Sequence, residues 1–332
     1  MSTFMKRTGP ALWLFFIAAL LDLPLAGPAL AQTATFVAVG NDTVAPGGRI
    51  LTSPQGSVWV PQISNSPVFL WGATRGAGLI VAVGDQGMVV TSPDGVTWTP
   101  QISNVAISTL FNITFGGGHF VAVGSDGTIV TSPDGINWTN QFSGTTNNLF
   151  GVKHGNGAFV AIGNLGTILR SPDGINWNPV ADSGLVTTEL MTGLTFGQGK
   201  FVATGDAETV LSSTDGNIWT LEQTTAPNLG ELLWSVHFDR GLFLAVGTNG
   251  TIKTSPNGTD WTDRISNLAT DLFSVTFNSG TFAAVGALGG VVTSPDGVTW
   301  TARNSGTTDA LNAITPGKTY VFMPNLFRDA DF

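Results

Sequence analysis

The stretch Ser-Pro-Asp-Gly-Ile-Asn-Trp at residues 132–138 decides the fold, because close variants of it recur along the chain. Six further copies stand at 53–59, 92–98, 171–177, 213–219, 255–261 and 294–300. Their tryptophans are spaced 39, 40, 39, 42, 42 and 39 residues apart. A period near forty residues is typical of propellers and solenoids, whose units must stack to bury their faces.

Each residue of the motif has a structural role. Proline presets the first central position of a turn, the Asp side chain accepts hydrogen bonds from backbone N–H groups, and Gly takes a positive φ. Trp buries a large face between adjacent units. We expect these residues to be structural, because a catalytic group is not needed seven times around a ring. The set is Asp94, Asp134, Asp173, Asp215, Asp296, Trp59, Trp98, Trp138, Trp177, Trp219, Trp261 and Trp300.

Each unit resolves into four β runs, called a to d in chain order. In one unit they are residues 110–115, 119–124, 128–132 and 136–142, separated by turns rich in Gly, Asp and Asn. Such runs predict a meander of four antiparallel strands. Seven units therefore predict an all-β chain folded as a seven-bladed β-propeller. Two β-sandwiches are the alternative, but they do not need so strict a repeat.

The two ends of the propeller are predicted to close the ring. Residues 35–40 resemble a b strand with no a strand before them, whereas 311–315 resemble the missing a strand. We expect 311–315 to join the N-terminal blade, which removes open sheet edges. Residues 319–323 also resemble a b strand and compete for the same place. We favour 35–40, which continue into strand c.

The N-terminus has the features of a secretory signal peptide. Lys6 and Arg7 precede an apolar run at 11–21 that is too short to span a bilayer. Ala-Leu-Ala at 29–31 is a small-residue cleavage signature, so we expect cleavage after Ala31. The alternative is an uncleaved anchor. The predicted organisation is a signal peptide at 1–31, a propeller at 32–323 and a tail at 324–332, exported to the periplasm or beyond the cell with no membrane span.

Composition excludes several classes of protein. The 332 residues include 13 Lys+Arg and 22 Asp+Glu, for a net charge of −9, and no Cys. Without Cys there is no disulfide scaffold, thiolate metal site or catalytic thiol. An acidic chain lacks the basic footprint of a nucleic-acid binder. The three His lie in different repeats without metal-ligand spacing, so we expect neither a metal site among them nor catalytic residues.

One position of strand a breaks the repeat in two units. Five units have Thr there, whereas two have Lys153 and His237. Because strand a is innermost in a propeller, we expect these two side chains to reach the central channel. They are either solvated or hydrogen-bonded inner side chains, or part of a ligand site.

All four Glu of the chain fall within residues 189–231, with two Asp beside them. Most occupy d–a linkers or b–c turns, which emerge on one face of a propeller, and loops on a rigid scaffold often carry function. The candidate set is Asp182, Glu189, Asp206, Glu208, Glu222 and Glu231. These residues form an acidic rim or protein-binding surface, bind Ca²⁺, or supply the acid and base of a glycoside hydrolase.

At these motifs the chain resembles the BNR, or Asp-box, repeat propellers, which include sialidases and the photosystem II assembly and stability factors. The match covers nearly all of residues 35–322 and looks more like the assembly-factor type, because each motif is one residue tighter than in sialidases. The family's sialidases use an arginine triad and a Tyr nucleophile. Here the only Tyr is Tyr320, and the arginines do not all share one repeat position. Sialidase chemistry is therefore not expected.

Two function hypotheses follow. The first is an exported, monomeric, non-enzymatic propeller that binds a protein or other macromolecular partner through its d–a and b–c loop face, as the resemblance to assembly factors implies. The second is a glycan-binding protein or glycoside hydrolase that uses the acidic loops with Trp71 or Trp234, which stand in a strands where other units mostly have Phe. An enzyme of this kind needs two carboxylates about 5–9.5 Å apart in a pocket.

Overall fold

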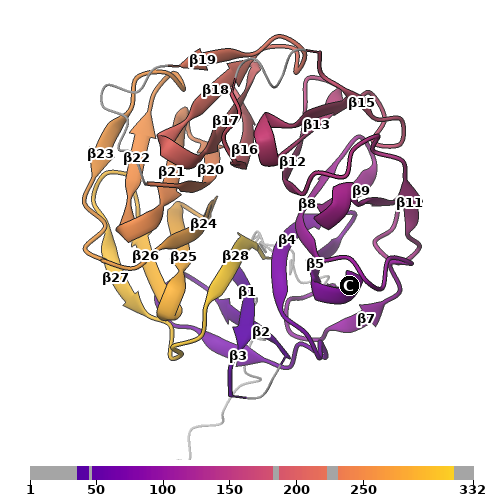
Figure 1. Ribbon diagram of the computed structural model, residues 1–332. Coiled ribbons are helices and arrows are strands. Elements are labelled where there is room, and N and C mark those ends of the chain that lie inside the picture. Colours follow the sequence, from indigo (N-terminus) through magenta and orange to yellow (C-terminus); the bar gives the residue numbers. More distant parts are fainter. Residues whose placement is uncertain (1–35, 45–46, 182–186, 223–230, 318–332) are drawn as a thin grey trace, which may run out of the picture. The chain divides into compact units, whose positions relative to one another are not determined.

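The computed structural model describes residues 36–44, 47–181, 187–222 and 231–317, and these form a ring of seven four-stranded antiparallel sheets (Figure 1). The predicted seven-bladed β-propeller is confirmed. We number the blades 1 to 7 in chain order, starting with the blade that contains β1. Blade 1 has the strand order β28–β1–β2–β3, and every other blade is four consecutive strands.

The strands of each blade follow one order from the axis outward. The innermost, or a, strands are β4 (Leu70–Gly76), β8 (Leu110–Gly116), β12 (Leu149–Gly155), β16 (Met191–Gly197), β20 (Leu233–Asp239), β24 (Leu272–Asn278) and β28 (Leu311–Pro316). The b strands are β1 (Phe36–Asp42), β5 (Leu79–Gly84), β9 (His119–Gly124), β13 (Ala158–Gly163), β17 (Lys200–Gly205), β21 (Leu242–Gly247) and β25 (Thr281–Gly286).

The outer half of each blade is shorter. The c strands are β2 (Gly47–Ser53), β6 (Val89–Ser92), β10 (Ile129–Ser132), β14 (Ile168–Ser171), β18 (Val210–Ser213), β22 (Ile252–Ser255) and β26 (Gly290–Ser294). The d strands are β3 (Val60–Gln62), β7 (Thr99–Gln101), β11 (Thr139–Gln141), β15 (Asn178–Pro179), β19 (Thr220–Glu222), β23 (Thr262–Arg264) and β27 (Thr301–Asn304).

Six of the b–c connections are single 3-10 turns. They are η1 (Asp85–Gly87), η2 (Ser125–Gly127), η3 (Asn164–Gly166), η4 (Asp206–Glu208), η5 (Thr248–Gly250) and η6 (Ala287–Gly289). Among the residues that the structure describes, no helix is long and apolar enough to cross a membrane.

The hydrophobic core lies between blades rather than within one. Each of the seven apolar clusters in the described ring joins two neighbouring blades. Between blades 2 and 3, for example, Val81 and Val89 pack with Phe120 and Trp138. Burying each such side chain contributes roughly 1.5–3 kcal/mol. Every blade therefore depends on both of its neighbours.

The repeated motif forms the c–d turn. Oδ1 of Asp134 accepts hydrogen bonds from the N–H groups of Ile136 (2.9 Å) and Asn137 (2.8 Å). Nε1 of Trp138 donates to the carbonyl of Gly135, whose φ is 76°. The N–H and side chain of Asn137, followed by the N–H of Ile136, hold the pKa of Asp134 well below its usual range. The motif thus joins a closed turn to the Trp that fills the space between blades.

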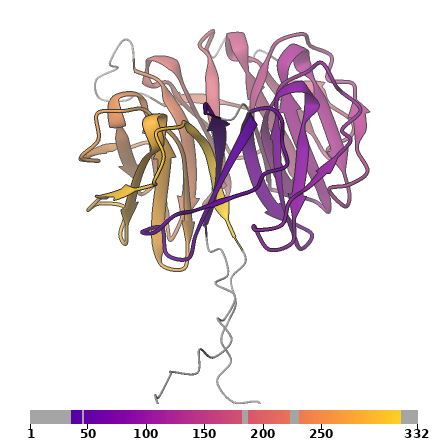
Figure 2. The same ribbon diagram turned by 90° about the horizontal axis from the view of Figure 1, so that it is seen from below.

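The predicted closure is confirmed. In β28, Pro316 pairs with Phe36 and Ala313 pairs with Val39, so the C-terminal strand supplies the inner strand of the first blade. Figure 2 shows β28, in yellow, beside the indigo strands of blade 1. Strand β1 fills the place predicted for residues 35–40. The competing segment 319–323, the predicted signal peptide and the predicted tail lie outside the described residues.

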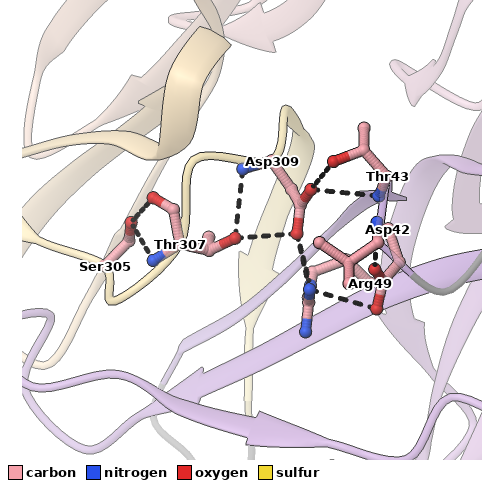
Figure 3. A network of polar contacts seen from close by, with 7 residues as sticks. Asp42, Thr43, Arg49, Ser305, Thr307 and Asp309 are labelled. Atoms are coloured by element: carbon pink, nitrogen blue, oxygen red, sulfur yellow. Dashed lines mark hydrogen bonds and ion pairs between the residues drawn. The ribbon is translucent and has the colours of Figure 1, made fainter.

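A polar latch reinforces this closure (Figure 3). Asp309, only 2% exposed, precedes β28. Its carboxylate accepts hydrogen bonds from the N–H (3.0 Å) and Oγ1 (2.5 Å) of Thr43, and from Oγ1 of Thr307 (2.7 Å). Nε of Arg49 donates to it at 2.9 Å, and Arg49 also pairs with Asp42 at 3.0 Å. The latch joins the last d–a loop to the b–c connection of the first blade.

We expect Asp309→Asn to lower the free energy of unfolding by about 3 kcal/mol at neutral pH, because it leaves Arg49 without its buried partner. Burial alone raises the pKa of Asp309, but hydrogen bonds from Thr43, Thr307 and Arg49 outweigh it and hold that pKa well below its usual range. The carboxylate therefore stabilises the fold fully above about pH 4 and less as the pH falls.

Urea unfolding of the wild type and of Asp309→Asn, measured between neutral and acid pH, tests this expectation. The matched control is Asp126→Asn, at an exposed carboxylate, which we expect to change stability by less than about 0.5 kcal/mol. A difference between wild type and Asp309→Asn that stays constant down to the most acidic pH contradicts the role of the charge.

Candidate functional site

A cavity of about 400 Å³ lies on the axis of the ring, where the inner strands begin. We call it the axial cup. The second residue of each inner strand contributes to its wall, so each blade supplies at least one side chain. These residues are Trp71, Phe111, Phe150, Thr192, Trp234, Phe273 and Asn312. Because the d–a loops lead into these strands, the axial cup belongs to the d–a and b–c loop face.

A β-bulge positions the wall residues. In blade 2 the register between β4 and β5 shifts between Leu70 and Gly72, which leaves Trp71 as the extra residue. The same shift occurs in the other blades, and in blade 1 it leaves Asn312 unpaired between β1 and β28. A bulge re-aims the side chain of the residue that it removes from the ladder. In blade 2 the following residue is Gly72, where a Cβ would lie 2.9 Å from the carbonyl oxygen of Phe111.

Aromatic side chains form two arcs of the wall. Phe111 lies between its neighbours, with its ring centroid 6.4 Å from Trp71 and 4.8 Å from Phe150. Trp234 meets Phe273 edge to face at 5.6 Å. Thr192 and Asn312 separate the arcs. The two Trp that break the repeat pattern are thus partly exposed wall residues of the axial cup.

Most polar atoms of the axial cup are already hydrogen-bonded within the protein. Nε1 of Trp71 donates to Asp85 at 2.7 Å, and Nδ2 of Asn312 donates to Asn41 at 2.8 Å. Oγ1 of Thr192 donates to a main-chain carbonyl. Nε1 of Trp234, by contrast, is buried and has no partner among the described residues. The axial cup therefore offers a largely apolar surface.

Lys153 and His237 lie further along the inner strands β12 and β20. Burial lowers the pKa of Lys153. Burial, together with the positive charge of Lys153, lowers the pKa of His237 to about 3, and its Nε2 has no partner in the described part of the chain. The role of both residues in binding stays a prediction.

Four of the five described acidic candidates lie on adjoining d–a and b–c loops, namely Glu189, Asp206, Glu208 and Glu231. Glu222 lies on the outermost strand of blade 5, where Ser212 donates to it at 2.5 Å. Asp206 opens η4 and accepts from the next N–H, and Glu189 is a partly buried loop residue. Asp182 lies outside the described residues. The main-chain N–H of Asp206 donates to the carbonyl of Leu190, and that of Glu208 donates to the carbonyl of Glu231, so these loops adjoin.

Glu208 occupies an exceptional position. The five other 3-10 turns end in Gly with φ between 63° and 73°, whereas Glu208 adopts φ 52° and is 1% exposed. Its Oε1 lies 3.0 Å from Nζ of Lys253, which also pairs with Asp263 at 2.6 Å. Burial raises the pKa of Glu208, although Lys253 opposes this. Lys253 itself stands where the other blades carry Val or Leu. Both members of the pair thus depart from the repeat together.

The described residues contain no group of three or more His, Asp or Glu arranged to hold a metal ion. The Ca²⁺ hypothesis also involved Asp182, so it stays a prediction. The wall of the axial cup includes a single carboxylate, Asp271, whose Oδ1 accepts from the N–H of Asn249 at 2.9 Å. This wall therefore does not supply the carboxylate pair that glycoside hydrolysis needs.

Comparison with known proteins supports the fold. No protein-family model matches the chain, and no curated protein does. Among solved structures, YCF48 from Cyanidioschyzon merolae is 17% identical and covers 72% of this chain and 86% of its own, with a TM-score of 0.56. YCF48 bound to a D1 peptide is 20% identical. The match covers 70% of this chain and 81% of the YCF48 chain, with a TM-score of 0.55. Virginiamycin B lyase from Staphylococcus aureus is 13% identical. The match covers 71% of this chain and 84% of the lyase chain, with a TM-score of 0.61.

Replacing Glu208 and Lys253 by the residues of the other blades tests their pairing. We expect Lys253→Val alone to destabilise the protein by about 3–5 kcal/mol, because it leaves a buried carboxylate without its partner. The double variant Glu208→Gly/Lys253→Val should be as stable as wild type or more stable, because it restores an apolar contact and an unstrained turn.

Chemical unfolding of the wild type, both single variants and the double variant completes a double-mutant cycle. Additive effects of the two substitutions would show that the ion pair contributes no coupling and would contradict this account.

Proposed function

We propose that the protein is an exported, non-enzymatic, monomeric binding module of the BNR/Asp-box type, similar to the photosystem II assembly factors. It holds a protein partner on its d–a and b–c loop face. The axial cup carries this proposal, because it is a concave, aromatic-walled hollow on that face. Interfaces concentrate their binding energy in buried aromatic anchors and the pockets that receive them.

The chemistry of the axial cup favours a protein segment over a glycan. Sugar rings carry several hydroxyl groups that need partners, and burying them without partners is costly. The side chains of Trp71, Thr192 and Asn312 already donate to groups of the protein itself. An apolar or aromatic side chain makes no such demand. The YCF48 structure with a D1 peptide shows a propeller of this fold in complex with a peptide, which agrees with this choice.

Truncating the axial cup should abolish partner binding. We expect Phe111→Ala to remove the middle of one aromatic arc and to weaken binding by about 2 kcal/mol or more, which is roughly thirtyfold. The control is Ile218→Ala, which truncates an apolar side chain that is 77% exposed in the c–d turn of blade 5, away from the d–a and b–c loop face. The measurement is quantitative pull-down from the native host, followed by titration with the partner identified. Equal loss in both variants, or in neither, contradicts a role for the cup.

The acidic side chains on the d–a and b–c loop face, among them Glu189 and Glu231, are expected to favour a basic partner. Replacing both Glu189 and Glu231 by Lys reverses their charge. It should slow association with a basic partner and make the association rate depend less on salt concentration. Association rates measured at two ionic strengths test this. Unchanged rates would restrict the contact surface to the axial cup.

A further inference from the structure

Aromatic rings from five different blades line the axial cup. They are Trp71, Phe111, Phe150, Trp234 and Phe273. The planes of Trp71 and Phe111 lie at 74° to each other, and those of Trp234 and Phe273 lie at 90°. The faces of aromatic rings carry partial negative charge, and pockets walled by several rings bind alkylated ammonium groups in proteins. The wall is therefore suited to a cation as well as to an apolar group.

Carboxylates adjoin this wall, and no positive charge does. Asp271 is itself a wall residue, and within the described part of the chain only its Oδ1 accepts a hydrogen bond, from the N–H of Asn249. Asp85 accepts from Nε1 of Trp71, which raises the electron density of that indole ring and strengthens its attraction for a cation. The residues that line the cup include no Lys, Arg or His.

The loops that surround the cup extend this negative field. In the described residues, the d–a loops and b–c turns contain no Lys, Arg or His. Arg49, near the start of β2, pairs with Asp42 and Asp309. A cleft surrounded by charges of one sign raises the local concentration of the opposite charge. The acidic residues of these loops and turns are Asp85, Asp126, Glu189, Asp206, Glu208, Glu231, Asp271 and Asp309.

The hydrogen bonds of the wall select the kind of cation. A primary ammonium or a guanidinium group brings several N–H donors, which need acceptors when they leave water. Most of the wall is aromatic, and its single carboxylate, that of Asp271, already accepts from Asn249 through Oδ1. A quaternary ammonium group has no N–H and presents only methyl groups, so it carries the charge without that demand. The cup thus matches a quaternary ammonium better than a Lys or Arg side chain.

We infer that the axial cup binds a trimethylammonium group, with its methyl groups against the aromatic arcs and its charge balanced by Asp271. The inference rests on the proposed function, because it names the chemistry that the same site recognises. The volume of about 400 Å³ lies within the range of pockets for small ligands, roughly 300–1,000 Å³. The group comes either from a free small molecule or from a trimethylated lysine of the protein partner.

Calorimetry with two probes of the same shape tests the inference on the protein as it is. Choline carries the trimethylammonium group, whereas in 3,3-dimethylbutan-1-ol a carbon atom replaces the charged nitrogen. We expect choline to bind at least about tenfold more tightly than the alcohol, because only the charged group is attracted by the ring faces and the carboxylate. A site that recognises apolar shape alone would bind the alcohol at least as well.

Two conservative variants separate the charge from the packing. Phe111→Leu keeps an apolar side chain but removes a ring, and we expect it to weaken choline binding about tenfold. Asp271→Asn keeps the acceptor for the N–H of Asn249 and removes the charge, and a similar loss is expected. The matched control is Asp126→Asn, at an exposed carboxylate of η2 that does not line the cup, and it should bind choline like wild type.

The inference is overturned if choline does not bind, if the alcohol binds as tightly, or if Phe111→Leu and Asp271→Asn both bind choline like wild type. A capped tripeptide with trimethyllysine at its centre separates the two sources. Tighter binding of this peptide than of choline identifies a side chain of the partner, and binding of choline alone identifies a free small molecule.

The same measurements distinguish this inference from the proposed function. If choline does not bind while Phe111→Ala still loses its partner, the inference fails and the proposed function stands. If choline binds while Phe111→Ala keeps its partner, the proposed function fails and the axial cup is a small-molecule site.

Discussion

The pairing of β28 with β1 is the interaction on which the rest of the structure depends. Because every apolar cluster in the described ring spans two blades, an open ring would expose two of these faces to water. Backbone pairing from Phe36 to Gly40 and the carboxylate of Asp309 hold this junction. The axial cup exists only while the junction is closed, because Asn312 of β28 forms part of its wall.

The same inner strands connect the fold to its site. Each strand begins with a buried Leu or Met, places its second residue in a bulge, and continues with a small residue where neighbouring strands approach closely. The bulge is therefore a local feature of the fold that creates a hollow without loosening the core. Lys153 and His237 lie two residues beyond the small residue of their strands.

The repeat made most of the fold predictable, because Trp138 and its equivalents mark each blade and the missing a strand reappears at residues 311–315. The axial cup was harder to foresee. Trp71 and Trp234 stand out because other a strands mostly have Phe there, but Phe111 reads as ordinary alternation, and a bulge leaves no mark in composition. Closeness in sequence grouped Glu222 with Glu231, whereas the structure places Glu222 on the outer strand of its blade. Alignment of the repeats does reveal Glu208, which stands where five other turns have Gly.

The closing strand also imposes an order in time. During synthesis, β1 emerges first among the described strands, yet its inner neighbour β28 follows more than 260 residues later. Until then, β1 presents an unpaired edge and blade 1 lacks its innermost layer. Joining segments so far apart along the chain carries a large entropy of loop closure, and such long-range contacts make folding slow. The ring is thus completed by one late, long-distance event rather than blade by blade.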